Sequence, residues 1–308
     1  METLKVETLR RKDFKSKILT VLWELKKNGR ADATIKNIGK RLRVLAKSCD
    51  LDNPEQVKTF IAILDRKNGY KKALTFAYDN YVKIHGLQWQ RPNYWVASKL
   101  PKIPLESQID LIISNASLKL ATAISISKDT GLRPIELVNL KVKDIDLTKG
   151  AVYPETAKHG SPRILKIQNT TLNLLNKYLA SRHFGVNDKL FTWWNSHKYG
   201  QCFRETRNKV AKKMCNESIK SIRLYDLRHF FATMLYKRTK DILFVRQQLG
   251  HRNIKNTLKY TQLLQFENDD NYTCKVAQNA EQATQLIENG FEYVATTPEG
   301  LMLFRKRK

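Results

Sequence analysis

The segment 249–263, LGHRNIKNTLKYTQL, carries the residues on which the interpretation of this chain depends. Leu249 and Gly250 are typical of the end of a helix, so His251 is predicted to stand at a helix junction. Tyr260 follows nine residues later and is predicted to lie on the next helix. A tyrosine phenol can attack a phosphodiester when cationic side chains hold the phosphate. If Tyr260 acts in this way, arginines elsewhere in the chain are expected to bind the phosphate, and two candidates precede this segment.

The first of these arginines, Arg133, lies in TGLRPIEL (130–137). Gly131 frees the backbone, and Pro134 suits the first position of a helix. Arg133 is therefore predicted at a helix start, where backbone N–H groups also favour an anion. Glu136, three residues further on, is expected to hold the guanidinium in place. The alternative is a surface arginine that caps the helix.

The second arginine, Arg228, lies in LYDLRHFFATML (224–235). Tyr225 and Arg228 are three residues apart and are expected to share one helix face. Their hydroxyl and guanidinium groups are predicted to converge on one phosphate, the alternative being that Tyr225 is a core tyrosine. His229 is expected to point elsewhere on the helix and, like Glu136, to support the site from behind rather than to contact the phosphate. His251, taken alone, is also more typical of a structural histidine.

Lys158 is a candidate proton donor in the polar turn 158–162, between strands predicted at 151–154 and 163–167. A loop lysine can reach the DNA and protonate the oxygen that leaves when a phosphodiester breaks. His159, Arg163 and Lys166 compete for the same role.

The charge balance predicts a polyanionic partner. The 308 residues include 56 Lys and Arg against 29 Asp and Glu, a net charge of +27. The surplus is shared between residues 1–100 and 101–270 rather than gathered in a tail, which favours nucleic acid over a set of solvated lysines. Four scattered cysteines are typical of reduced thiols, and we expect a cytoplasmic protein with no signal peptide and no membrane span.

Hydrophobic spacing predicts a mainly α fold with a small antiparallel β-sheet (α+β). Residues 1–90 are expected to form a helical domain that grips DNA, from helices over 10–28, 33–48, 52–65 and 69–84, with Asp32 as an N-cap. Residues 91–104 are predicted to be a linker. Trp89, just before it, and Trp95, within it, are expected to dock on a domain surface. Residues 105–268 are predicted to be a catalytic domain, and 269–308 an appendage.

The first helix predicted in the catalytic domain begins near residue 105. Further helices are predicted over about 118–129, 170–182, 198–214, 224–238, 241–249 and 254–262. Residues 266–273 are predicted to be a hinge. The appendage is expected to hold a helix over 280–288 and strands over 291–295 and 301–304, joined by a turn at 298–300.

Taken together, the three segments 130–146, 224–235 and 249–263 resemble the boxes of the tyrosine recombinases (phage-integrase/Xer family). The resemblance spans about 96–265, and the four helices before it resemble the family's core-binding domain. It implies that Tyr260 is the nucleophile, that Arg133, Arg228 and His251 bind the phosphate, and that Lys158 is the general acid.

Tyr225 departs from the family pattern, which usually has histidine there. A phenol donates a hydrogen bond to phosphate but carries no positive charge near neutral pH. This variant is similar to integrases of archaeal viruses and plasmids, which favours integration or excision of a mobile element.

The resemblance further implies a C-shaped clamp on double-stranded DNA and a 3′-phosphotyrosine intermediate. Four protomers would assemble on DNA and pass through a Holliday junction, with no cofactor, metal ion or ATP. The alternatives are an Xer-like resolvase of chromosome or plasmid dimers, a type IB topoisomerase acting as a monomer, and a non-catalytic DNA-binding relative. Tyr272 is the alternative nucleophile.

Overall fold

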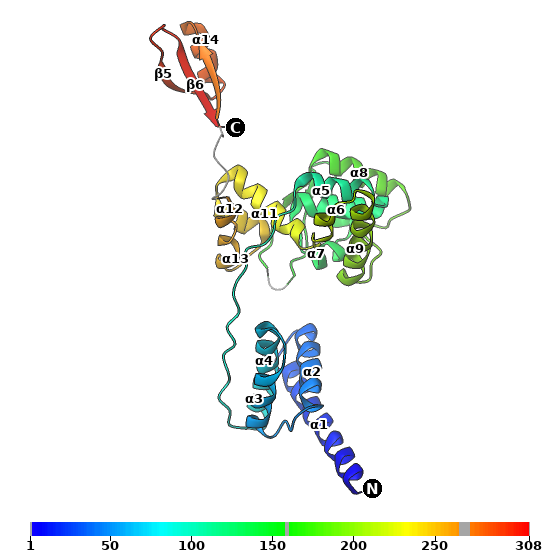
Figure 1. The fold of residues 1–308 in the computed structure, drawn as a ribbon. Coiled ribbons are helices and arrows are strands. Elements are labelled where there is room, and N and C mark those ends of the chain that lie inside the picture. The colour runs from blue at the N-terminus through cyan, green and yellow to red at the C-terminus, as the bar shows by residue number, and fades with distance from the viewer. Residues whose placement is uncertain (1, 158–159, 265–271, 308) are drawn as a thin grey trace. The chain divides into compact units, whose positions relative to one another are not determined.

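The computed structural model describes residues 2–157, 160–264 and 272–307 (Figure 1). It divides into two compact units, Met1–Lys99 and Leu100–Lys308. Both units are largely helical, and the strands form small antiparallel sheets, which confirms the predicted fold class. Within the described ranges, no helix is long and apolar enough to cross a membrane.

The N-terminal unit contains four helices in its described residues. They are α1 Glu2–Lys27, α2 Asp32–Ala46, α3 Pro54–Ile63 and α4 Asn68–His85. One fully buried residue from each helix illustrates how they share a core: Val21, Leu42, Ile61 and Leu74. The predicted N-cap at Asp32 is wrong, because Ala31 occupies that position and Asp32 is already the first helical residue.

Residues 87–105 contain no helix or strand. Trp89 packs edge-on against Tyr78, with ring centroids 4.8 Å apart, and its Nε1 donates a hydrogen bond to Asp79 Oδ1 at 3.3 Å. Trp95 is 76% exposed. Of the two tryptophans expected to dock on a domain surface, Trp89 therefore docks and Trp95 does not.

The second unit is built around the buried helix α6, which packs against α5, α8 and α11. Its helices up to residue 264 are α5 Glu106–Ser114, α6 Leu118–Thr130, α7 Pro134–Asn139, α8 Asn169–Ala180, α9 Ser196–Lys213, α10 Glu217–Lys220, α11 Asp226–Thr239, α12 Ile242–Leu249 and α13 Lys255–Leu258, with 3₁₀ turns η1 Val142–Asp144 and η2 Gln262–Leu264. The predicted helix 254–262 is thus wrong in its second half, and Tyr260 lies in the turn that follows α13.

A three-stranded antiparallel sheet adjoins these helices, in the order β1-β2-β3. The strands are β1 Ile145–Asp146, β2 Ala151–Val152 and β3 Leu165–Lys166. The two predicted strands are therefore present but shorter than expected. β1 was not predicted, because two residues are too few to show an alternating pattern. Residues 160–163 lead from the turn after β2 back into β3, which positions one side of the candidate site.

The C-terminal segment forms a separate small sheet, in the order β4-β6-β5, together with one helix (Figure 1). Its elements are β4 Tyr272–Ala277, α14 Ala280–Glu288, β5 Glu292–Thr296 and β6 Met302–Arg307. Ala277, Ala283 and Phe304 are buried where the helix covers the sheet. The predicted helix and both predicted strands are confirmed. The predicted hinge is wrong at 272–273, which begin β4, and its remaining residues 266–271 lie outside the described part.

Candidate active site

Arg133 stands at the sharp turn between α6 and α7. Gly131 ends α6 with φ +60°, and a Cβ there would lie 2.4 Å from Phe231 Cδ1, so only glycine fits. Arg133 is the N-cap of α7 and Pro134 its first residue, as predicted. The backbone N–H of Arg133 donates to Glu136 Oε2 at 2.9 Å and its Nη1 donates to Oε1 at 2.7 Å. One carboxylate therefore sets both the backbone and the side chain of Arg133.

Glu136 also binds a second arginine, which lies two residues before β3. Arg163 Nη2 donates to Glu136 Oε2 at 2.6 Å, and the Arg163 side chain is 1% exposed. Burial alone would raise the pKa of Glu136, but the charges and hydrogen bonds of Arg163 and Arg133 outweigh it and lower the pKa. The carboxylate is therefore ionised and holds two guanidinium groups together.

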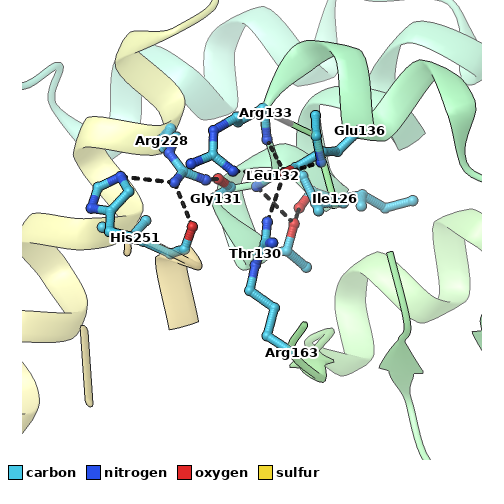
Figure 2. A network of polar contacts seen from close by, with 11 residues as sticks. Ile126, Thr130, Gly131, Leu132, Arg133, Glu136, Arg163, Arg228 and His251 are labelled. Atoms are coloured by element: carbon cyan, nitrogen blue, oxygen red, sulfur yellow. Dashed lines mark hydrogen bonds and ion pairs between the residues drawn. The ribbon is translucent and has the colours of Figure 1, made fainter. Parts of the chain in front are cut away.

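Arg228 connects two turns that are far apart in the sequence. Its side chain, on α11, donates from Nη1 to the Gly131 carbonyl at 2.7 Å and from Nη2 to the Leu249 carbonyl at 2.6 Å. The residue is 1% exposed. Burial and the neighbouring Arg133 lower its pKa to about 10, so it remains charged at neutral pH. Figure 2 shows Arg228 between His251 and Arg133.

His251 follows Gly250, which ends α12 in the left-handed region with φ +62°. Arg228 Nη2 lies 3.0 Å from His251 Nε2, and Thr257 Oγ1 lies 3.0 Å from Nδ1. A guanidinium only donates, so Nε2 must accept and Nδ1 carries the hydrogen that it donates to Thr257. Burial, with Arg228 and Arg133, lowers the pKa of His251 to about 3, and the ring is neutral.

Tyr260 is buried at 1% exposure, and its Oη lies 3.0 Å from His229 Nδ1. Burial raises the pKa of the phenol above its ordinary value, and the charge of Arg228 only partly offsets this. Lys259 Nζ lies 5.2 Å from the centroid of the Tyr260 ring. Burial and the charge of Arg228 lower the pKa of this lysine. The candidate nucleophile is thus a protonated phenol beside cationic groups.

The structure brings most of the predicted site residues together. Hydrogen bonds connect Arg228 directly to His251, and both Arg228 and Arg133 belong to the polar network around the Gly131 turn (Figure 2). Tyr260 is attached to α11 through His229. Lys158 and its competitor His159 lie outside the described residues. Lys166, another competitor, is an exposed residue of β3.

Two interpretations of α11 are corrected. Tyr225 is the N-cap of the helix and is 43% exposed, so the alternative of a core tyrosine is wrong, whereas Arg228 is buried. His229 does not point away from the site. Its ring lies edge-on to Tyr225, with centroids 5.2 Å apart, because residues four apart are neighbours on a helix. The same ring contacts Tyr260, which comes from the turn after α13.

The sequence interpretation missed that Arg163 is the second partner of Glu136. A signal was available in RILKI (163–167), where Arg163, Leu165 and Ile167 alternate with exposed residues and are all buried. Such alternation predicts that Arg163 points to the same buried side as Leu165 and Ile167. The contact between His229 and Tyr260 joins segments 31 positions apart, and no local pattern reveals it.

Comparison with known proteins agrees with this architecture. Residues 105–266 match the phage integrase family. The tyrosine recombinase XerA of Saccharolobus solfataricus is 36% identical over 141 residues, which cover 46% of this chain and 45% of that relative. The chain thus aligns with less than half of that relative's length. XerA of Pyrococcus horikoshii is 29% identical over 212 residues, covering 66% of this chain and 74% of the relative.

Among solved structures, a lambda integrase dimer bound to a COC′ core site shares the fold, with a TM-score of 0.63 at 15% identity. The match covers 83% of this chain and 97% of that one. The fold and the family match define a protein of the integrase class. The chain belongs to the phage integrase family, and its similarity to named tyrosine recombinases confirms the resemblance seen in the three sequence segments.

Proposed function

We propose that this protein is a site-specific DNA recombinase that cuts and rejoins double-stranded DNA through Tyr260. The Oη of Tyr260 attacks the scissile phosphorus, the bond from phosphorus to the 5′ oxygen breaks, and a 3′-phosphotyrosine forms. The free 5′ oxygen takes a proton from a general acid, for which we propose Lys158. Attack by a 5′ hydroxyl on the phosphotyrosine reverses the step. The covalent link conserves the bond energy, so the reaction needs no ATP. We propose that guanidinium groups, rather than a metal ion, stabilise the charge on the phosphate.

The observation that carries this proposal is the state of the buried guanidinium of Arg228. Its Nε is buried and has no hydrogen-bond partner among the described residues. An unpaired buried donor is costly, and a non-bridging phosphate oxygen would satisfy it. Arg133, which touches the same turn, would bind the second oxygen. Two fixed guanidinium groups stabilise the negative charge that grows on the phosphate in the transition state.

His251 and Tyr225 would serve as further donors to the phosphate. His251 is neutral in the free protein because it is buried beside Arg228. An incoming phosphate anion favours the protonated form of an imidazole, so DNA binding is expected to raise the pKa of His251. Tyr225 is exposed and donates without charge. His251 would then be the one imidazole that can take up a proton beside the phosphate. Relatives with histidine in place of Tyr225 would have a second.

For the domains, we propose that residues 1–90 grip one side of the duplex and that residues 105–268 hold the chemistry, with 91–104 as linker and 269–308 as appendage. The net charge of +27, shared by both segments, supports a DNA partner. Strand exchange between two duplexes requires four cleavages, which supports a tetramer on DNA. We place the reaction in the cytoplasm, on DNA of a host cell.

For the biological role, we propose integration or excision of a mobile element, such as an archaeal virus or plasmid. Tyr225, in the position where relatives usually have histidine, supports this choice. Dimer resolution is the second candidate, favoured by the similarity to XerA proteins. A recombination assay separates the two roles. Pairing the element's attachment site with a chromosomal site should give product, whereas product only between two identical chromosomal sites would favour resolution.

A nicked suicide DNA substrate tests the chemistry. Cleavage near the nick releases a short fragment, so religation fails and the covalent adduct accumulates. We expect an adduct with the wild-type chain and none with Tyr260→Phe, whereas Tyr272→Phe should behave as wild type. Loss of the adduct only in Tyr272→Phe would reassign the nucleophile. Relaxation of supercoiled plasmid by the monomer, without strand exchange, would indicate a type IB topoisomerase instead.

A further inference from the structure

The Oη of Tyr260 is held by one polar group in an apolar setting. The ring lies among Ala232, Leu235, Val245 and Leu249, and its Oη lies 3.0 Å from His229 Nδ1. A buried phenol hydroxyl requires a hydrogen-bond partner. His229 is the partner found among the described residues, and it is itself 7% exposed.

The imidazole of His229 is held in a defined orientation. The Tyr225 ring packs against it at 72°, with centroids 5.2 Å apart. The His229 and Tyr260 rings are tilted by 52°, with centroids 5.9 Å apart, so they meet through the hydrogen bond rather than by stacking. The position of the phenol oxygen is therefore set by α11, the helix that also carries Arg228.

The direction of this hydrogen bond depends on the protonation states and on the tautomer of His229. Burial raises the pKa of Tyr260, so the phenol keeps its hydrogen. Burial and the charge of Lys259 lower the pKa of His229 to about 4, so the ring is neutral near pH 7. With both groups neutral, the tautomer of the imidazole sets the direction of this hydrogen bond. We assign the tautomer with its hydrogen on Nε2, in which the phenol donates and His229 Nδ1 accepts.

We propose that His229 positions the phenol of Tyr260 for attack and accepts its proton during DNA cleavage. As the bond between Oη and phosphorus forms, the bond between Oη and hydrogen breaks and the proton moves to Nδ1. The electron pair of the broken phosphorus–oxygen bond stays on the 5′ oxygen, which is protonated by the general acid. During religation the proton returns from His229 to Tyr260. This assignment rests on the proposed recombinase chemistry.

The surroundings of His229 explain why transfer occurs only with DNA bound. The charged or titratable groups that act on it are Lys259, Asp226, Arg223, Arg228, Tyr225 and Tyr260. In the free protein the cations among them oppose a charged imidazole. A bound phosphate offsets this cationic field, which makes the imidazole a better proton acceptor. Bond formation to phosphorus makes the phenol hydrogen more acidic at the same moment.

Single-turnover cleavage of the suicide substrate tests the proposal. His229→Ala removes both functions and should slow cleavage by about 100-fold or more. His229→Asn keeps an acceptor near the place of Nδ1, so it should cleave faster than His229→Ala. Because an amide does not titrate, its rate should rise with pH between 6 and 9 more steeply than that of wild type. Exposed His183→Asn is the matched control and should match wild type.

A substrate with sulfur as the bridging 5′ atom separates the two ends of the reaction. A thiolate leaves without an acid, so this substrate should restore cleavage to a general-acid variant such as Lys158→Ala. It should not restore His229→Ala, whose defect lies in the attack. Full restoration of His229→Ala would place the histidine at the leaving group and overturn the proposal.

Two further results would overturn the role proposed for His229. One is cleavage by His229→Ala at the wild-type rate and with the wild-type pH dependence. The other is cleavage by His229→Ala faster than wild type, which would mean that the contact restrains Tyr260. Nuclear magnetic resonance of ¹⁵N-histidine without DNA provides a test independent of cleavage, and the other histidine resonances report whether the variant is folded. Tyr260→Phe should shift the Nδ1 resonance of His229, whereas an unchanged resonance refutes the contact. If wild type gives no adduct but the shift appears, the recombinase proposal fails and the positioning contact stands.

Discussion

Replacing Glu136 by glutamine should destabilise the second unit more than any loss of a surface charge. The carboxylate is fully buried between Arg133, which is 14% exposed, and Arg163, which is 1% exposed. Glutamine keeps the size of the side chain but removes its charge. Two guanidinium groups, one of them fully buried, then lose their counter-ion.

Breaking a buried ion pair by removing one partner costs about 3–5 kcal/mol. Solvent screening is small here because Glu136 and Arg163 are inaccessible to water. A domain of this size loses about 2–4 °C of Tm per kcal/mol, so the transition of this unit should fall by about 6–20 °C. Calorimetry of the full chain measures it directly.

Glu217→Gln is the matched control, since the pair of Glu217 with Lys220 is exposed. Its effect should stay within about 0.5 kcal/mol. The folded-state pKa of Glu136 is lowered, so its stabilising charge is complete above its ordinary value of 4.5 and is lost as the pH falls through the lower folded value. The difference in Tm between wild type and Glu136→Gln should therefore become smaller in acid. A Glu136→Gln transition within 1 °C of wild type at pH 7 would refute the role given to this carboxylate.

Two other predictions follow from the same region. Gly131→Ala should lower the unfolding free energy by more than about 1–3 kcal/mol, because a side chain at this positive φ is strained and the new Cβ would also collide with Phe231. Gly86→Ala is the control, since Gly86 has a similar φ but nothing within 4 Å of the added Cβ. Equal losses of the two variants in denaturant titrations would argue against the contact. Burial lowers the pKa of His229 to about 4 and of His251 to about 3, so the unfolded chain binds more protons below pH 6.5. Tm should therefore be highest above pH 6.5 and fall towards pH 5. The fall should be shallower in a variant carrying both His229→Asn and His251→Asn. If Tm falls with the same slope in both proteins, the histidines are not buried in the neutral form.

Local patterns were sufficient to predict much of this fold. The turn at Gly131, the helix start at Pro134 and the helix Ala280–Glu288 each depend on residues within one or two turns of chain. The same patterns failed where tertiary structure decides. The helix expected over 254–262 stops at Leu258, and the first strand of the C-terminal sheet is stabilised by pairing with β6, which lies far along the chain.

The site shows the same division. The sequence identified Arg133, Arg228, His251 and Tyr260 as a group, but not how they are held. Arg228 bonds to a carbonyl 97 positions away, and Arg163 reaches Glu136 across 27. His229 was expected to support the site without contacting Tyr260, because a helical pattern alone does not show which loop packs on which face. Contacts of this kind depend on packing between distant segments, which a single sequence does not reveal.

The central claim is that Tyr260 forms the covalent bond to DNA. Mass spectrometry of the protease-digested adduct from a suicide substrate identifies the modified residue directly. We predict a 3′-linked nucleotide on the peptide that contains Tyr260, with the site assigned by fragmentation. A nucleotide on Tyr225 or Tyr272, or a linkage through the 5′ phosphate, would contradict the account.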